Sequence, residues 1–139
     1  MVALSDAPID VAAVLGSVRD DACGAIASFT GVVRGDEEAG DRVAALEYEA
    51  HPGMAVAAMR KIGEEVAGPE SMRCAIHHRT GRVAVGEVSV VVAVAAPHRA
   101  EALEACRIAV DRLKATVPIW KKVLFTSGRT AWAEGTPLA

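Results

Sequence analysis

Residues 97–122 read PHRAEALEACRIAVDRLKATVPIWKK, and the rest of the chain is organised around this stretch. Its apolar residues recur at steps of three and four, which is the spacing of one face of an amphipathic helix. That face consists of Leu103, Cys106, Val110, Leu113 and Val117. Pro118 ends the predicted helix because a proline disfavours helical backbone angles in the residue before it. We therefore expect one long packing helix with basic residues at both of its ends.

Basic residues mark both ends of this stretch. His98 and Arg99 open it, and the free backbone N–H groups and dipole of a helix start favour a negatively charged ligand there. Lys114, Lys121 and Lys122 close it. A lysine near a helix C-terminus ordinarily just complements the dipole, and this is the simpler interpretation of Lys114 taken alone. The dense IWKK around the proline favours a functional site instead.

The length and composition of the chain limit the class of protein. A chain of 139 residues, 52% hydrophobic and 24% charged, fits one globular domain. We expect a single domain over residues 1–139, with 1–8 and 134–139 frayed. The net charge of −3 argues against a general nucleic-acid binder, whose surface would be strongly basic.

The sequence carries no signal for a membrane, a disulfide framework or a metal site. No apolar run reaches the roughly 18 residues of a membrane span, and the first residues lack the features of a signal peptide. We therefore expect a cytoplasmic protein. Three cysteines without a CxxC spacing indicate neither disulfides nor zinc. Adjacent strand residues face opposite sides, so His77 and His78 would not share a metal either.

Two further helices and a series of strands follow from the patterns along the chain. Glu87–Ala96 is nearly continuous in apolar residues, which is typical of a central strand covered on both faces. Hairpin-type strands with packing helices favour an α+β fold. Helices are expected over Ile9–Arg19 and from Pro52 to about Gly68, and strands over Gly24–Val33, Val43–Ala50, Met72–His78, Val83–Val85, Val123–Phe125 and Arg129–Trp132.

Arg34 is a further candidate for binding an anion. It stands at the end of the Gly24–Val33 strand, beside an acidic loop that contains glycine. A strand end next to a mobile loop is where a site can be built on rigid support. Gly31 in the same strand indicates a bulge or a close backbone approach. No dinucleotide-binding, P-loop or nucleophile-elbow spacing occurs in the sequence.

Five segments together resemble the large, catalytic subunit of molybdopterin synthase, the MoaE family. They are FTGVVR at 29–34, LEYEAHPGMA at 46–55, HHRTGRVAVGE at 77–87, the pair HR at 98–99 and LKATVPIWKK at 113–122. The resemblance runs from about Gly24 to Lys122, and the combination of HR, LK and P-x-W-K is its specific part. It implies an α/β-hammerhead-type fold, with a mixed or antiparallel sheet and two to three packing helices. It also implies a homodimer with a small ubiquitin-like sulfur-carrier subunit at each end, a heterotetramer.

The reaction implied by the resemblance is a sulfur transfer. Sulfur passes from the C-terminal thiocarboxylate of the carrier to cyclic pyranopterin monophosphate and gives the dithiolene of molybdopterin, with no metal or other cofactor. The resemblance implies that the catalytic residues are Lys114 and Lys121, and that the substrate-binding residues are Arg34, His98, Arg99, Lys122 and Phe29. In the family, the His-Arg pair reaches a pocket that the second copy of the dimer completes.

These residue types suit that chemistry, because both reactants are anionic. The planar fork of an arginine binds a phosphate bidentately, which a lysine does not. Two lysines packed together and partly desolvated each favour the neutral form of the other, which makes one available for proton transfer. Our hypothesis from the sequence is that Lys114 transfers the proton and holds the thiocarboxylate while Lys121 supports the intermediate.

The chain departs from the family pattern at three positions, and two other functions stay open. Val123 stands where an acidic residue is common, His51 where an aromatic residue is common, and the spacing around Arg129 is looser. One alternative is a non-catalytic binding module for an acidic carrier protein or peptide. The other is a different enzyme that acts on a phosphorylated heterocycle. Turnover with a thiocarboxylated carrier distinguishes the three.

Overall fold

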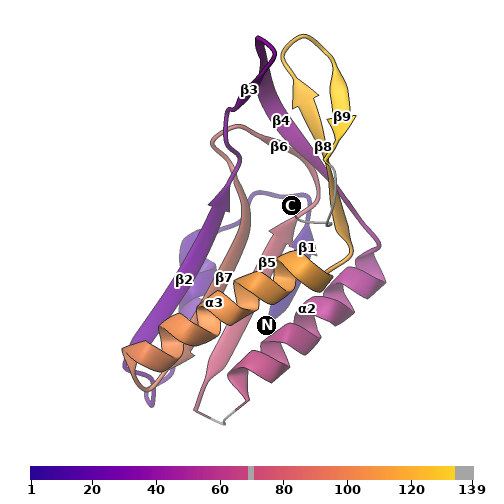
Figure 1. The fold of residues 1–139 in the computed structure, drawn as a ribbon. Helices are drawn as coiled ribbons and strands as arrows, with labels where there is room; N and C mark the ends of the chain where they lie inside the picture. Colours follow the sequence, from indigo (N-terminus) through magenta and orange to yellow (C-terminus); the bar gives the residue numbers. More distant parts are fainter. Residues whose placement is uncertain (69–70, 134–139) are drawn as a thin grey trace.

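The computed structural model describes residues 1–68 and 71–133 as two sheets and three helices (Figure 1). The helices are α1 (Val11–Ser17), α2 (Pro52–Ala67) and α3 (Arg99–Thr116). The strands are β1 (Val2–Ser5), β2 (Ala25–Val32), β3 (Glu37–Glu38), β4 (Asp41–Ala50), β5 (Arg73–Arg79), β6 (Gly81–Ala84), β7 (Val88–Ala96), β8 (Ile119–Phe125) and β9 (Thr130–Trp132). No helix of this part of the chain is long and apolar enough to cross a membrane.

The first sheet has the strand order β1-β5-β7-β2 and holds the main core. Strand β7 lies inside it and is buried from Ser89 to Ala96, as predicted for a central strand. Alternate residues of β7 face two cores, a large one under α2 and α3 and a smaller one under α1. Figure 1 shows α2 and α3 on one face of this sheet and α1 on the other. Because β1 pairs parallel and the other strands antiparallel, the sheet is mixed, as expected.

The second sheet joins the first at the C-terminal end of α3. It has the order β3-β4-β8-β9, with β6 also paired to β4. In Figure 1 it extends beyond the end of the first sheet, so that β8 leaves α3 and enters it directly. One mixed sheet, one antiparallel sheet and three helices confirm the predicted α+β class.

The predicted stop at Pro118 creates this connection. Helix α3 ends at Thr116, and Val117 already has extended backbone angles, φ −78° and ψ 129°. Strand β8 begins one residue after the proline. The strand is longer than the predicted Val123–Phe125, because the residues from Ile119 onward pair with β4.

Two expectations from the sequence were wrong. Residues 1–8 are not frayed throughout, since Val2–Ser5 form β1 and pair in register with Ile76–Arg79 of β5. The predicted fraying of 134–139 lies outside the described residues. In α3, Leu103 is 62% exposed, whereas Ala102, Ala105 and Ala109 are buried with Cys106 and Leu113. Small alanines allow the helix to approach the sheet closely, so the packed face is shifted from the stripe of large residues.

Two positions that the sequence analysis singled out, His51 and Gly31, have a local structural role. His51, in place of an aromatic residue, caps α2, since its Nδ1 accepts a hydrogen bond of 3.2 Å from the Met54 N–H. The register between β2 and β7 shifts between Gly31 and Val32, which confirms the predicted bulge. A Cβ on Gly31 would lie 2.6 Å from Cγ1 of Val90, so only glycine allows this close approach.

Candidate functional site

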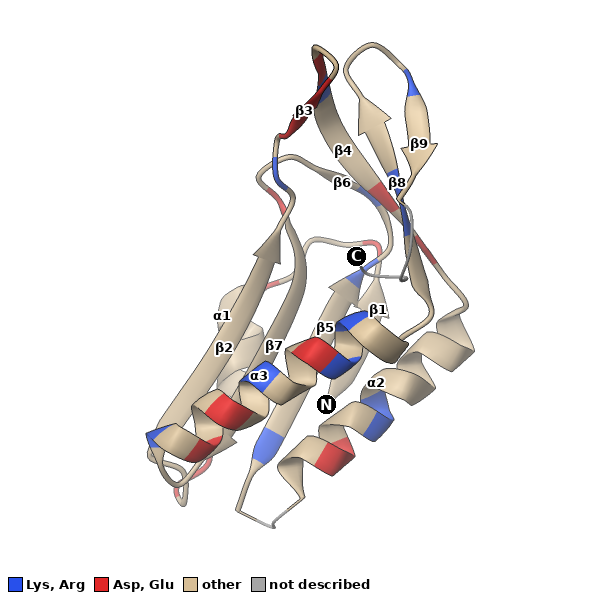
Figure 2. Cartoon of the chain, in the orientation of Figure 1, with Lys and Arg blue, Asp and Glu red and all other residues tan. Residues whose placement is uncertain are grey.

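Lys114 and Lys121 lie on either side of the turn at Pro118. Lys114 is exposed in the last turn of α3, and Lys121 is half-buried as the third residue of β8. Burial lowers the pKa of Lys121, and the positive charges of Lys114 and Arg34 lower it further, against an opposite effect of Asp36. Three cations, from α3, β8 and the end of β2, therefore lie near enough for their charges to interact. Figure 2 shows basic residues at the C-terminal end of α3 and along β8.

Arg34 reaches this point from the end of β2. Its side chain is 84% exposed, and its Nε lies 2.9 Å from Oδ1 of Asp36. The bulge at Gly31 sits just before it and redirects the end of the strand. An arginine held from one side by a carboxylate keeps further N–H donors for an anionic ligand.

Tyr48 and His78 form the floor beneath the lysines. Tyr48 lies directly opposite Lys121 in the β4–β8 ladder, and its ring meets the His78 ring edge to face at 5.0 Å. Both side chains are buried. Burial lowers the pKa of His78 to about 4, and the charge of Lys114 acts in the same direction, so the imidazole is neutral at physiological pH. Burial raises the pKa of the Tyr48 hydroxyl.

Sequence reasoning missed this floor. It considered His78 only together with His77 as a possible metal pair. The available signal was its position, because His78 ends a strand on the same side as Ile76, which faces the main core. Tyr48 has the same kind of signal, since it stands in a strand that runs toward the site.

Lys122 faces away from Lys121, as strand alternation requires. Its Nζ lies 3.9 Å from Glu47 Oε2 and 4.9 Å from the centroid of the Trp132 ring. Arg129 is likewise engaged within the second sheet, with its guanidinium 3.9 Å from the centroid of the Phe125 ring. Within one chain the structure therefore does not bring Lys122 to the lysine site.

His98, Arg99 and Phe29 also lie away from the lysines. Arg99 precedes Lys114 by 15 residues of α3, which is about 22 Å at 1.5 Å per residue. His98 is exposed, and its Nδ1 lies 3.2 Å from Oε1 of Glu101. Phe29 is half-buried on β2 and lines a groove against α3 with Leu103 and other residues. A single copy of the chain thus holds the predicted site in two separate parts.

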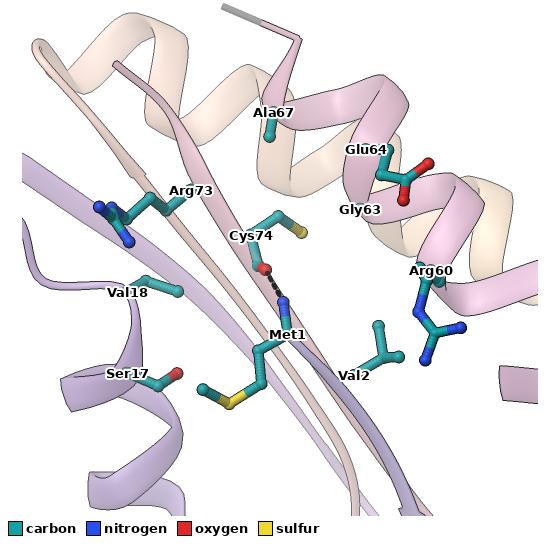
Figure 3. Close-up of a pocket in the computed structure, with 10 residues that line it drawn as sticks. All are labelled: Met1, Val2, Ser17, Val18, Arg60, Gly63, Glu64, Ala67, Arg73 and Cys74. Carbon is teal, nitrogen blue, oxygen red and sulfur yellow. Dashed lines mark hydrogen bonds between the residues drawn. The ribbon is translucent and has the colours of Figure 1, made fainter. Parts of the chain in front are cut away.

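The two buried cysteines, Cys74 and Cys106, are not suited to nucleophilic chemistry. Cys74 lines a hollow between α1, α2 and β5 that contains none of the predicted site residues (Figure 3). Burial raises the pKa of Cys74 to about 11 and also raises the pKa of Cys106, so both thiols stay protonated at neutral pH. Among the described residues, no three His, Cys, Asp or Glu side chains are placed to hold a metal ion.

Comparisons with known proteins identify the family. The profile of the MoaE protein family matches residues 4–116. The chain belongs to the MoaE family. The molybdopterin synthase catalytic subunit of Oryza sativa subsp. indica is 46% identical over 127 residues, which cover 91% of this chain. The chain spans 65% of the length of that rice protein.

Solved structures agree with the MoaE assignment. Molybdopterin synthase from Staphylococcus aureus matches with a TM-score of 0.88 and 32% identity, covering 95% of this chain and 96% of that one. A complex of subunits 1 and 2 of the molybdopterin-converting factor from Helicobacter pylori matches with a TM-score of 0.80 at 20% identity, covering 96% and 90%. At that identity the likeness shows the fold alone. The family and the fold that the five segments implied are confirmed.

Proposed function

We propose that this chain is the catalytic subunit of a molybdopterin synthase. It transfers sulfur from the thiocarboxylated C-terminus of a small ubiquitin-like carrier subunit to cyclic pyranopterin monophosphate, and so forms the dithiolene of molybdopterin. The observation that carries the proposal is the convergence of Lys114, Lys121 and Arg34 on one point at the junction of the two sheets. The catalytic subunits among its MoaE relatives support the same activity.

The charge of this site fits the two reactants. The cyclic phosphate and the thiocarboxylate are both anions, and the carboxylate beside these cations, Asp36, is exposed and paired with Arg34. Arg34 offers its remaining N–H donors to the phosphate or to the carrier tail. An ammonium beside the reacting carbon stabilises the negative charge that develops when the sulfur attacks and again when the carrier thioester is hydrolysed.

The electrostatics favours the reverse of the roles that the sequence led us to expect. Lys121 is the half-buried lysine with the lowered pKa, so it is the better proton acceptor of the two. Lys114 is exposed at the end of α3, where a positive charge is also favoured by the helix dipole. We assign proton transfer to Lys121 and the binding of the thiocarboxylate and developing anion to Lys114.

We infer that the partner of this chain is a small carrier subunit. The Helicobacter pylori structure that shares its fold is a complex of subunits 1 and 2 of the molybdopterin-converting factor. Its C-terminal tail has to reach the space between Arg34, Lys114 and Lys121. Lys114 and Arg34 are both exposed, so an extended tail can approach without displacing the core. With one carrier on each copy of a homodimer, the assembly is a heterotetramer.

We place the homodimer contact along β2 and α3. Strand β2 is an edge of the first sheet, and its outer side has no strand partner within the described residues. Ile26 and Val32 on this strand are 41% and 53% exposed, and Leu103 on α3 is 62% exposed. An unpaired strand edge flanked by exposed apolar side chains is a surface that a second copy can cover.

A two-fold axis at the middle of this contact would complete the site. This axis makes the two β2 strands antiparallel neighbours. The start of α3 in one copy then lies beside the end of β2 in the other. The two ends of α3 lie about 25 Å apart, and β2 has a similar length. His98 and Arg99 of the partner would then approach Arg34 and Lys114. The dimer would thus bring together predicted site residues that lie far apart within one chain.

Reconstitution tests the proposed activity. The purified chain is mixed with a thiocarboxylated carrier subunit and cyclic pyranopterin monophosphate, and the product is oxidised to its fluorescent form. We expect product from the wild type and a loss of about 100-fold or more in kcat for Lys121→Ala and for Lys114→Ala. Lys61→Ala is the matched control, because Lys61 is an exposed lysine on α2 that pairs with Glu65.

Three other results of this experiment would contradict parts of the proposal. Tight binding of the carrier without product would indicate a non-catalytic module. Turnover that needs no carrier would indicate a different enzyme acting on the heterocycle. Wild-type rates in both lysine variants would contradict the assignment of the site.

A further inference from the structure

The turn that leads from β6 to β7, residues 84–87, holds the residue that precedes Arg34. Both backbone groups of Val33 are bonded to this turn. The Val33 N–H donates a hydrogen bond of 3.0 Å to the carbonyl oxygen of Glu87, and the Val33 carbonyl oxygen accepts one of 2.9 Å from the Gly86 N–H. The Val33 side chain is buried as well. The turn therefore fixes the end of β2 and, with it, the point from which the Arg34 side chain extends.

The same turn connects Arg34 to the sheet that carries Lys121. Gly35, which follows Arg34, lies against Val85, since a Cβ on Gly35 would lie 3.2 Å from Cγ1 of Val85. The Val85 N–H donates a hydrogen bond of 3.1 Å to the carbonyl oxygen of Ala44 in β4. Strand β4 in turn pairs with β8, which contains Lys121. The residues on both sides of Arg34 thus contact one turn, and that turn is bonded to the second sheet.

The carboxylate of Glu87 braces this turn. Its Oε1 accepts a hydrogen bond of 2.7 Å from the Ala84 N–H, and its Oε2 lies 3.6 Å from Nη1 of Arg79. Arg79 is 6% exposed, and its Nη2 donates a hydrogen bond of 3.1 Å to the carbonyl oxygen of Asp6. A buried guanidinium that is held by a backbone carbonyl has little freedom to move. Arg79 is therefore a rigid anchor for the carboxylate.

We propose that Glu87 is a positioning residue for Arg34: its carboxylate fixes the turn whose backbone bonds hold the end of β2. The inference rests on the proposed function, because it concerns the placement of a residue of that site. Arg34 is 84% exposed, and an exposed ion pair such as Arg34–Asp36 holds a side chain only weakly. Its placement therefore depends on the backbone beneath it. The proposal also gives a role to the segment 77–87, which resembles the family but supplies none of the predicted site residues.

A double-mutant cycle with Arg34 tests this role. Arg34→Ala should lower kcat/KM of the proposed sulfur transfer by about 100-fold, the size of a lost charge-assisted contact. Glu87→Ala should lower it by about 10-fold, because a displaced arginine keeps only part of that contact. The double variant should be no slower than Arg34→Ala, since Glu87 acts through Arg34. Independent effects multiply instead, so a double variant about 10-fold slower than Arg34→Ala would overturn the proposal. A wild-type rate in Glu87→Ala would overturn it too.

Glu65→Ala is the matched control. The Glu65 side chain is 43% exposed, against 45% for Glu87, and it also pairs with an arginine from another element, Arg112. This control should turn over at the wild-type rate. If Glu87→Ala does not fold because Arg79 is left buried without its carboxylate, Arg79→Met/Glu87→Ala takes its place in the same cycle, since it buries no unpaired charge. The same non-additive loss is then expected.

A second measurement does not depend on turnover. The Arg34 Nε–H donates a hydrogen bond to Asp36, so in protein with ¹⁵N-labelled arginine its NMR signal reports where the side chain lies. The signal should move in Glu87→Ala and stay in place in Glu65→Ala. An unmoved signal in Glu87→Ala would overturn the role of Glu87 even if the wild type is active. An inactive wild type in which the signal responds to Glu87 would contradict the proposed function and leave the positioning of Arg34 established.

Discussion

A lysine amine in water is almost entirely protonated at neutral pH, because its pKa lies near 10.4. Lys121 differs from this because β8 carries it into contact with β4, where burial and the charges of Lys114 and Arg34 disfavour its ammonium form. The sequence predicted the two lysines as a pair. It could not predict which one is buried, because that depends on the pairing of β8 with a strand far away in the sequence. The role of each lysine is therefore a property of the fold.

At the same scale, His78 makes the protein sensitive to acid. Its pKa is about 4 in the folded chain, whereas a histidine in an unfolded chain has a pKa of about 6.5. Between these values the unfolded chain binds more protons, so stability rises with pH. The free energy of unfolding should therefore fall by up to about 3 kcal/mol as the pH drops from about 6.5 to about 4. Urea titrations at several pH values measure this loss. In His78→Phe that part of the pH dependence should be absent, and a curve parallel to the wild type would contradict the assignment.

At the scale of elements, the end of β2 depends on the bulge at Gly31. A Cβ there would lie 2.6 Å from Cγ1 of Val90, a side chain that is only 5% exposed and has little room to move. We expect Gly31→Ala to lower the free energy of unfolding by about 1–3 kcal/mol. Because Arg34 follows three residues later, we also expect a loss of the proposed sulfur-transfer activity that is larger than the unfolded fraction explains.

Gly16 supplies the matched control for this substitution. It lies in α1, where an added Cβ meets no atom within 4 Å. Gly16→Ala should leave activity unchanged and raise the free energy of unfolding by up to about 1 kcal/mol, since alanine is the better helix former. Chemical denaturation of both variants gives the comparison. Equal stability of Gly31→Ala and the wild type would mean that Val90 can yield and that the bulge does not need glycine.

The elements also show what the sequence could predict and where it failed. The central strand β7 and the stop of α3 before Pro118 followed from local patterns and were confirmed. The predicted packed face of α3 was right at Cys106, Leu113 and Val117 but wrong at Leu103, because the helix packs closely on β2 and β7 and buries its alanines. Strand β1 was missed because Val2–Ser5 is short and is stabilised by its pairing with β5.

At the scale of the whole molecule, the predicted site residues fall into two groups that lie far apart within one chain. Arg99 and Lys114 lie at opposite ends of α3, and no rotation of side chains closes about 22 Å. The sequence placed both residues correctly in one helix but could not bring them together, because the proposed contact lies between copies. An antiparallel contact along β2 predicts that each site takes its lysines from one copy and its His-Arg pair from the other.

Mixed dimers test this arrangement directly. Lys114→Ala and Arg99→Ala are co-expressed with different tags, and dimers that carry both tags are purified. If the residues act across the dimer, one of the two sites in each mixed dimer is intact, so we expect about half of the wild-type rate although each parent variant is inactive. Mixed dimers of Lys114→Ala and Lys121→Ala are the control and should stay inactive, because both lysines come from the same copy. Absence of recovery in the first mixture would place Arg99 and Lys114 in the same site of one chain and would contradict the proposed contact along β2.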